Sequence, residues 1–436
     1  MRSTVGTSSR LGGMIVAAML CAAGLAFCGC AGDARPIRTE AELYEMQSAD
    51  EELAATEFAA AVERCVVRVG AEGAGLDGPV CDVLALSGGG DFGAFGSGFL
   101  LGWGETPDDT DRRPDFDGVS GVSTGSLIAP FAFLGDEGSL QQIDQFYRNP
   151  RQDWIKTRGW FFFLPMFPSF MEIPGLDRDI RGAIDEAFIR RIAARASEGR
   201  VLLVSATNLD LGTQRAWDLG GYATRMQTPS DIDRIHRMMF ASSAIPAVFP
   251  PIEIDGFLYA DGGVTANVLL RLDPSSPTGF PQTWQRIHPG RPMPRIRYWI
   301  IVNNQLRQPP ATVRTRWPSI FGPSLATAIR SATVAEIRWL AAQADYTNAA
   351  FGTNIEVRSV AIPNDWRPPV KGDFQKPTMD SLSDLGREMG KDPRSWTLWT
   401  RPLAATQSSG VEAREAVGQE HASTGTGVST SPSSSR

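Results

Sequence analysis

The sequence predicts an α/β fold in which a mostly parallel central sheet is flanked by helices. Short apolar runs that end in glycine or polar residues alternate with longer segments of helical periodicity along most of the chain. Such alternation is typical of βα units, whose helices cover the faces of a buried sheet. The composition agrees with this class, because 42% hydrophobic and 21% charged residues in a chain of 436 suit a globular protein with a large core.

Charge and residue usage exclude several classes of protein. The chain has 42 Lys and Arg against 49 Asp and Glu, which gives a formal net charge of −7. Because a nucleic-acid binder usually shows a basic excess, we expect no nucleic-acid partner. The sequence also lacks the spacings of zinc sites, zinc proteases and calcium loops, so no metal and no other cofactor is predicted.

The amino terminus, residues 1–30, is predicted to be a signal peptide with a lipobox. Two arginines precede the apolar run 14–27, which is shorter than the roughly 20 residues of a membrane span. The cysteines that follow resemble a bacterial lipobox, with Cys30 as the lipidated residue and Cys28 as its rival. This interpretation implies a lipoprotein anchored in the cell envelope, on the periplasmic or cell-surface side. An ordinary cleaved signal peptide, and thus a secreted protein, is the alternative.

Two further cysteines, Cys65 and Cys81, remain after such a cleavage. An exported protein enters an oxidising compartment, where these residues could form a disulfide. The alternative is a pair of buried thiols, and the sequence does not decide between them.

The elements follow in order along the chain. Residues 31–78 are predicted to form a helical segment, with a helix over 39–69, and a glycine-rich linker. A main domain over 79–365 comes next. Its predicted strands and helices alternate, with strands at 83–86, 119–120, 201–206 and 297–302 and helices at 94–103, 127–134, 231–243 and 324–342. Residues 366–401 are a C-terminal extension. The Ser/Thr/Gly-rich tail 402–436 is predicted to be disordered, because it has too few apolar residues to form a core.

The first motif with chemical meaning is GVSTG, which places Ser123 between a predicted strand and a predicted helix. A G-x-S-x-G sequence in this context is typical of a sharp turn that exposes the serine hydroxyl at the helix N-terminus. Gly121 and Gly125 are needed there, because side chains would collide with the neighbouring strand and helix. A plain strand–helix turn is the alternative for this motif taken alone.

The second motif is SGGGDFG, which follows a predicted buried strand. Its glycines allow several backbone N–H groups to point at one place, as an oxyanion hole requires. The predicted hole consists of Gly88, Gly89, Gly90 and Asp91, and Gly93 completes the motif. The same letters fit a dinucleotide-binding loop. That function is disfavoured because the next strand leads directly into the Ser123 motif, which a nucleotide site does not need.

The third motif is Asp261 followed by Gly262 and Gly263. An aspartate in a glycine-rich turn is often structural, but a serine nucleophile also needs a base that accepts its proton. Asp261 can serve as that base, since the two glycines let the backbone bend and present the carboxylate. An aspartate is a weak base, so it requires an oriented hydrogen bond and partial desolvation.

In their order, the three motifs resemble the patatin-like phospholipases over residues 83–264, together with ASSAIP at 241–246 and FPP at 249–251. The resemblance implies a patatin-like three-layer fold and a catalytic domain over 79–365. It further implies a Ser–Asp dyad that hydrolyses the acyl esters of phospholipids or other lipids. Carried over by motif, Ser123 is the nucleophile, Asp261 is the proton acceptor, and the glycine loop is the oxyanion hole. One departure is Phe92, where the family often has Lys or Arg.

Three alternatives remain open. A Ser–Asp–His triad would use His288, because His236 lies within a predicted helix and His421 lies in the predicted disordered tail. A catalytically silent, lipid-anchored scaffold is the non-enzyme alternative, although no motif residue is replaced. The aromatic segment 160–171 is either a lid that contacts lipid or the core of an insertion.

Overall fold

The computed structural model describes residues 35–72, 78–158, 168–270, 272 and 276–401, and residues up to Thr400 belong to one compact unit. The predicted signal peptide with Cys28 and Cys30, the predicted disordered tail and most of the 160–171 segment lie outside the described residues. In the described part of the chain, no helix is long and apolar enough to cross a bilayer.

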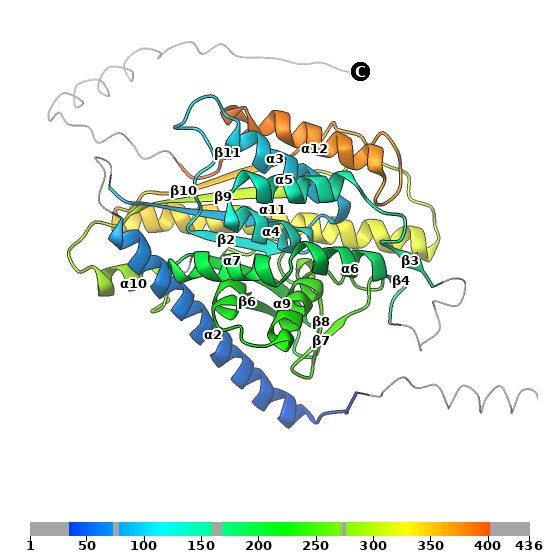
Figure 1. The fold of residues 1–436 in the computed structure, drawn as a ribbon, viewed down its shortest axis with the longest axis horizontal. Coiled ribbons are helices and arrows are strands. Elements are labelled where there is room, and N and C mark those ends of the chain that lie inside the picture. The colour runs from blue at the N-terminus through cyan, green and yellow to red at the C-terminus, as the bar shows by residue number, and fades with distance from the viewer. Residues whose placement is uncertain (1–34, 73–77, 159–167, 271, 273–275, 402–436) are drawn as a thin grey trace, which may run out of the picture. The chain divides into compact units, whose positions relative to one another are not determined.

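The core of the fold is a mostly parallel nine-stranded sheet (Figure 1). Along its main path the strand order is β11-β10-β9-β1-β2-β5-β8-β7, and β6 pairs with β5. The run from β10 to β5 is parallel, whereas β6, β7, β8 and β11 pair antiparallel. The strands are β1 (Val80–Leu86), β2 (Gly118–Val122), β5 (Val201–Asn208), β6 (Thr213–Asp218), β7 (Ile252–Ile254), β8 (Phe257–Asp261), β9 (Arg295–Gln305), β10 (Ile355–Ile362) and β11 (Thr397–Leu398).

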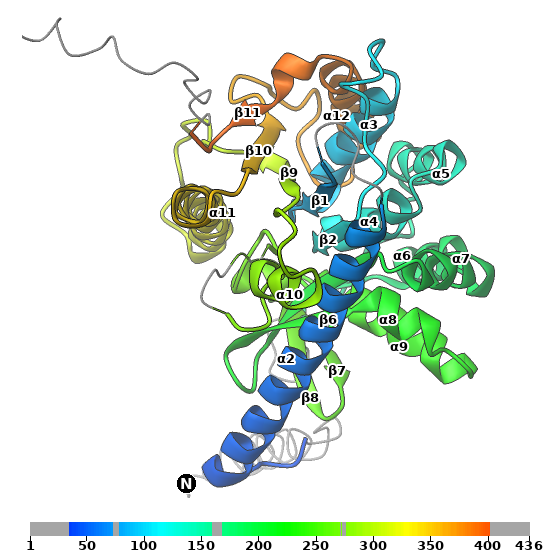
Figure 2. The same cartoon turned by 90° about the vertical axis from the view of Figure 1, so that its left-hand side faces the viewer.

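Helices cover both faces of this sheet, which gives the three layers expected from the sequence. The helices around the larger of two apolar cores are α3 (Gly93–Gly104), α4 (Thr124–Leu134), α5 (Glu137–Arg148), α6 (Pro174–Ala183), α7 (Glu186–Ser197), α8 (Leu219–Thr224), α9 (Pro229–Ser242) and α12 (Lys376–Gly390). The second core lies under α2 (Glu40–Ala71), α10 (Phe280–Ile287) and α11 (Trp317–Phe351). Figure 2 shows α11 on one side of the sheet and α3, α4 and α5 on the other.

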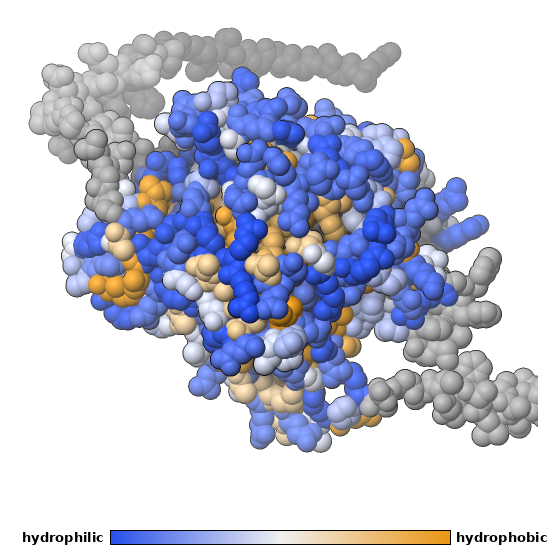
Figure 3. All heavy atoms as spheres, viewed as in Figure 1, coloured by the Kyte–Doolittle hydropathy of each residue, from blue (hydrophilic) through white to orange (hydrophobic). Residues whose placement is uncertain are grey.

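Alternation along β1 explains how one strand serves both cores. Leu84 and Leu86 pack into the larger core, whereas Cys81 and Ala85 pack into the second. Successive side chains of a strand point to opposite faces of the sheet, so a buried strand is apolar on both sides. The side of the molecule drawn in Figure 3, with α2, α5 and α7 in front, is mostly hydrophilic, and apolar residues appear on it in separate patches.

The predicted elements are present, with shifted ends. Helix α4 begins at Thr124, three residues before the predicted start, because the turn at Ser123 leads into it without a loop. Helix α11 has 35 residues and extends beyond the predicted 324–342 in both directions. Within the predicted extension 366–401, α12 packs on α3 and β11 joins the sheet beside β10. A two-stranded ribbon of β3 (Lys156–Thr157) and β4 (Met171–Glu172) was not predicted.

Candidate active site

Ser123 lies at the tight turn between β2 and α4. Its backbone has φ 53° and ψ −126°, a positive φ that is uncommon for a residue with a side chain. Both neighbouring glycines of the motif allow close approach of backbone: a Cβ on Gly121 would overlap the carbonyl of Gly125, and one on Gly125 would overlap the carbonyl of Leu86. The strained turn therefore holds the serine at the N-terminus of α4, where the helix dipole favours negative charge.

The end of helix α9 fixes this turn. The N–H of Ser123 donates to Ser242 Oγ over 3.0 Å. The carbonyl oxygen of Ser123 accepts from Ser126 Oγ at 2.6 Å and from Ser243 Oγ at 3.1 Å. One residue further on, the carbonyl of Ala244 accepts the N–H of Asp261 at 2.8 Å. The ASSAIP segment thus ties the serine turn to the strand end that carries Asp261.

Asp261 ends strand β8, and its side chain contacts the side chain of Ser123. The carboxylate accepts the N–H of Gly263 at 2.8 Å and a side-chain hydrogen bond from Ser123. Burial raises the pKa of Asp261 to about 6, although both hydrogen bonds act to lower it. At neutral pH the group is therefore mostly ionised and has a pKa suited to a general base.

The glycine loop at the end of β1 packs directly against Ser123. A Cβ placed on Gly88 would lie 3.0 Å from Ser123 Cβ. The N–H of Gly88 donates to Asn267 Oδ1 at 3.0 Å, so this amide is already engaged. Within the described part of the chain, the N–H groups of Gly89 and Gly90 have no acceptor. They are therefore the amides of the predicted oxyanion hole that remain available for a ligand.

Asp91, the fourth residue of the predicted hole, has a different set of partners. Its carboxylate accepts the N–H of Phe374 at 3.0 Å and is also hydrogen-bonded by its own backbone. Burial raises the pKa of Asp91 to about 6. The side chain therefore ties the glycine loop to the loop before α12, and its amide is less available than those of Gly89 and Gly90.

Asn267 is a buried site residue that the sequence analysis missed. While its Oδ1 accepts the Gly88 N–H, its Nδ2 donates to Thr333 Oγ1 at 2.9 Å. The backbone N–H groups of Asn267 and Val268 donate to the carboxylate of Glu336 at 3.1 and 3.0 Å. Helix α11 thus holds this loop from behind. The sequence signal was only an asparagine shortly after Asp261. Its role cannot be recognised from the sequence, because it depends on hydrogen-bond partners in distant segments.

An apolar pocket opens beside Ser123. It has a volume of about 40 Å³, and its lining includes Leu127, Tyr147, Trp154, Leu176, Phe240 and Phe374. The Tyr147 hydroxyl hydrogen-bonds Thr124 Oγ1, and Gly93 leaves room for this pair because a Cβ there would overlap both groups. The pocket is apolar enough for a hydrocarbon chain but narrow, so a long acyl chain requires the lining side chains to move.

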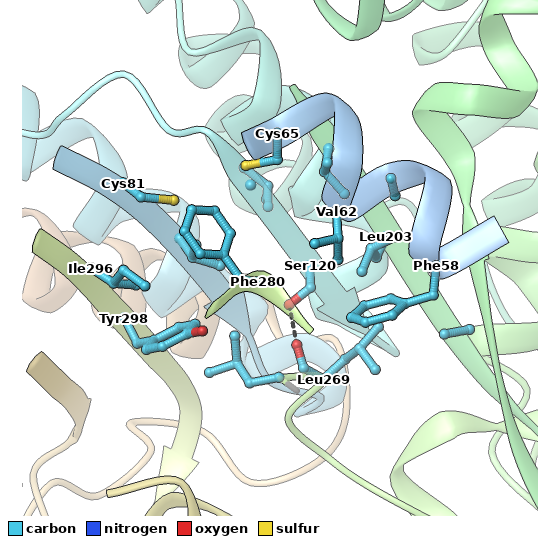
Figure 4. Close-up of a pocket in the computed structure, with 17 residues that line it drawn as sticks. Phe58, Val62, Cys65, Cys81, Ser120, Leu203, Leu269, Phe280, Ile296 and Tyr298 are labelled. Carbon is cyan, nitrogen blue, oxygen red and sulfur yellow. Dashed lines mark hydrogen bonds between the residues drawn. The ribbon is translucent and has the colours of Figure 1, made fainter. Parts of the chain in front are cut away.

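A second apolar cavity, of about 100 Å³, lies on the opposite face of the sheet under α2 (Figure 4). Its polar groups include Ser120, whose hydroxyl donates to the carbonyl of Leu269 at 2.6 Å, and the thiols of Cys65 and Cys81. Both cysteines are buried and free, so the structure has the thiol pair rather than the disulfide. A hydrogen bond with Cys65 that favours the protonated thiol, together with burial, raises the pKa of Cys81. No Asp, Glu, His, Lys or Arg lines this cavity among the described residues, which leaves the pocket at Ser123 as the candidate site.

The structure gives neither described histidine a contact with Ser123 or Asp261. His236 is buried in α9 with Nε2 2.8 Å from the carbonyl of Ile184, and burial lowers its pKa. His288 follows α10, where its ring packs on Trp284 and Nε2 lies 3.3 Å from the carbonyl of Val66. His288 thus lies in the bend after α10 with its ring partly buried between α10 and α2. His421 lies outside the described residues.

Comparison with known proteins identifies the region that contains these residues. The family model described as patatin-like phospholipase matches residues 84–272. These residues are similar to the patatin-like phospholipases. The match confirms the resemblance and the fold class expected from the sequence, and it supports an esterase- or lipase-type hydrolase. All three motifs, with Ser123 and Asp261, lie inside the matched region.

Two further proteins are similar to this chain. An uncharacterized protein of Acanthamoeba polyphaga mimivirus is 28% identical over 192 residues, which cover 43% of this chain and 60% of that protein. The chain therefore matches less than two thirds of that relative's length. The crystal structure of VipD from Legionella pneumophila aligns with a TM-score of 0.34 at 12% identity, over 75% of this chain and 69% of VipD.

Proposed function

We propose that the protein is a lipid acyl hydrolase in which Ser123 is the nucleophile and Asp261 is the proton acceptor. The observation that carries this proposal is the contact between a serine on a strained turn and a buried aspartate whose carboxylate has few other partners. The patatin-like match to residues 84–272 supports the same reaction class. The silent-scaffold alternative gains nothing from the structure, since both side chains of the dyad are present and face one another.

The geometry supports a two-step reaction through an acyl-enzyme. Ser123 Oγ attacks the ester carbonyl while its proton passes to the Asp261 carboxylate. The carbonyl oxygen becomes negative, and we assign its hydrogen-bond donors to the N–H groups of Gly89 and Gly90, which have no acceptor in the described part of the chain. As the tetrahedral intermediate collapses, the alcohol leaves with the proton from Asp261. Water then loses a proton to the same carboxylate and attacks the acyl-enzyme, which releases the carboxylic acid and restores Ser123.

The substrate class follows from the pocket beside Ser123. Its lining residues are apolar or aromatic, apart from small hydroxyl groups near the serine, so it suits an acyl chain better than a polar substituent. No cation stands at Phe92, whose ring instead packs edge-on against Trp366 at 5.6 Å. A phosphate group would therefore find no partner at this position, and both phospholipids and neutral acyl lipids stay within the proposal.

The experiment that tests the proposal compares wild type, Ser123→Ala, Asp261→Asn and His288→Ala on a short p-nitrophenyl ester and on a phospholipid. We expect Ser123→Ala and Asp261→Asn to lose at least about 1,000-fold in kcat on both substrates. His288→Ala is the matched control and is expected to keep its activity, since the ring is on the other face of the sheet.

Each contrary result has a definite meaning. Loss of activity in His288→Ala with unchanged folding would replace the dyad by a His-dependent triad. A folded wild-type protein that hydrolyses neither substrate would favour the scaffold alternative. The relative rates on the two substrates separate an esterase from a phospholipase.

The predicted lipidation of Cys30 and the location in the cell envelope stay predictions. They rest on the amino-terminal sequence alone. Incorporation of a radiolabelled fatty acid into wild type but not into Cys30→Ser would support them, and labelling that persists unless Cys28 is replaced would move the site to Cys28.

A further inference from the structure

Helix α11 presents an apolar outer surface that no described part of the chain covers. Its inner side is buried against the sheet through Thr333, Ile337, Leu340, Ala344 and Thr347. The opposite side carries a row of exposed residues that we call the outer strip: Ile320, Phe321, Ala328, Ala335, Trp339 and Tyr346. Trp339 is 52% exposed and Tyr346 is 61% exposed. From Phe321 onward these residues recur at steps of seven or four, which places them on one side of an α-helix.

The charges near the outer strip are mostly positive. Residues 306–346 contain five arginines, at positions 307, 314, 316, 330 and 338, and two acidic residues, Glu336 and Asp345. Glu336 points inward, where its carboxylate accepts the N–H groups of Asn267 and Val268. None of the five arginines forms an ion pair with another described residue. This basic region stands out in a chain whose formal net charge is −7.

The first half of α11 also extends past the sheet on the side of the candidate site. The Arg330 side chain donates to the carbonyl of Gln305 at 2.7 Å and to Asn304 Oδ1 at 3.0 Å. These residues end β9, and the parallel strands β1 and β2 end on the same edge, where the glycine loop and Ser123 follow. The helical residues before Arg330 therefore project roughly 20 Å beyond that edge at 1.5 Å per residue. No residue from 319 to 332 is buried.

We propose that the outer strip of α11 docks on the surface of an anionic lipid bilayer. Helices with an apolar side and flanking arginines lie in the plane of the membrane interface, and Trp and Tyr favour the same depth. The arginines supply the attraction to anionic headgroups. Docking by itself is independent of the reaction. The idea that it brings acyl lipids to Ser123 rests on the proposed function.

A second copy of this chain is a poorer occupant of the same surface. Two outer strips facing one another would bring two sets of unpaired arginines together, and like charges in an interface oppose association. An anionic bilayer can bury the apolar residues in its interface and attract the arginines to its headgroups. The observations therefore favour the membrane over self-association.

A site-specific probe tests the docking without relying on activity. The full chain is prepared with Ser123→Ala and with its three amino-terminal cysteines, at positions 21, 28 and 30, changed to serine, which also prevents lipidation. A bimane label is attached at Ala328→Cys on the outer strip or at Ala55→Cys on the exposed side of α2 as the matched control. Cys65 and Cys81 are buried and free, so they react poorly with the label.

We expect phosphatidylglycerol-containing vesicles to shift the bimane emission of the Ala328→Cys protein to shorter wavelength, and to leave the Ala55→Cys protein unchanged. Pure phosphatidylcholine vesicles should produce a much smaller shift. An unchanged emission at position 328 with both kinds of vesicle would overturn the proposal. A shift at position 328 that occurs without vesicles and rises with protein concentration would instead assign the strip to a second copy of the chain.

A second comparison links docking to turnover. The double variant Phe321→Ser/Trp339→Ser is expected to lose about tenfold or more of the hydrolysis of lipid in anionic vesicles, since interfacial binding scales with the apolar area that is buried. Its rate on a short soluble ester should stay within about twofold of wild type, because neither residue lines the pocket at Ser123. Equal losses on both substrates would show that the strip serves the fold rather than the membrane. If wild type hydrolyses no lipid while the label still reports docking, the proposed function fails and the docking surface stands.

Discussion

The amide oxygen of Asn267 accepts the N–H of Gly88 over 3.0 Å, and this hydrogen bond links the loop after Asp261 to the glycine loop beside Ser123. Since the remaining groups of Asn267 are held by Thr333 and Glu336 of α11, the position of the glycine loop depends on a helix that the three motifs do not include. A patatin-like site in this chain therefore has four parts: the serine turn, the aspartate, the glycine loop and α11 behind them.

We predict that Asn267→Ala lowers kcat on a short soluble ester by about 10- to 100-fold with little change in KM, because misplaced oxyanion donors act mainly on the transition state. Asn267→Asp retains an acceptor for the Gly88 N–H and should recover part of the lost rate. Thr333→Val removes a different partner of Asn267 and is the matched control, with a smaller loss expected. A rise in KM without a fall in kcat would show that Asn267 does not position the oxyanion donors.

The activity should fall in acid with a midpoint near the pKa of Asp261, which burial raises to about 6. The reaction requires the ionised carboxylate, so kcat/KM should fall tenfold per pH unit below the midpoint and reach a plateau above it. Asp117 has a pKa that burial likewise raises to about 6, but it lies at the start of β2 with Arg68 and the Asp82 N–H as partners. Asp117→Asn should therefore leave the midpoint unchanged. If the midpoint of the pH–rate profile shifts in Asp117→Asn, the titrating group is Asp117 and not Asp261, and the prediction is wrong.

The sequence predicted the parts of the site that lie within short motifs. Ser123, Asp261 and their glycines could be found because the turns they form constrain the residues at fixed spacing, as the close approaches at Gly121 and Gly125 show. The parallel order of the central strands was predictable for a similar reason, since each apolar run is followed by a helix.

What could not be predicted depends on contacts between distant segments. Gly88 was assigned to the oxyanion hole with its neighbours, but its N–H is taken by Asn267, which is 179 residues away in the chain. The engagement of Asp91 by Phe374 likewise spans 283 residues. Such partners have no local signature. The beginning of α11 was missed because residues 317–323 contain two prolines and a glycine, which are residues that usually interrupt a helix.

The pocket beside Ser123, rather than the cavity under α2, is expected to select the acyl chain. Leu176→Ala widens that pocket and should raise the ratio of long-chain to short-chain ester hydrolysis by several-fold, because removed side-chain volume becomes space for the chain. Ile296→Ala enlarges the other cavity and is the matched control. Both changes should lower the free energy of unfolding by about 2–5 kcal/mol. A loss of folded protein lowers the rates on long-chain and short-chain esters equally, so it does not change their ratio. If only Ile296→Ala changes the chain-length preference, the acyl chain binds in the cavity under α2 and not in the pocket beside Ser123, which would contradict the prediction.

Close packing of α3 on α12 makes the C-terminal region part of the folded body, and glycines set the distance between the two helices. A Cβ on Gly98 would overlap the carbonyl of Ser383, and one on Gly386 would overlap the carbonyl of Phe95. Gly98→Ala should therefore lower the free energy of unfolding by about 1–3 kcal/mol, the usual effect of overpacking.

Gly182→Ala is the matched control for this change, because a Cβ at that helical position meets nothing within 4 Å. It should be neutral or stabilising by up to about 1 kcal/mol, as expected for alanine in place of glycine in a helix. Urea unfolding of the three proteins measures the difference. Equal midpoints for Gly98→Ala and Gly182→Ala would mean that α12 can separate from α3 at little cost, and that residues beyond 366 are an appendage instead of a supporting layer. Because α12 precedes β11 and follows the Phe374 loop, its loss would also release the contact that holds Asp91 beside the glycine loop.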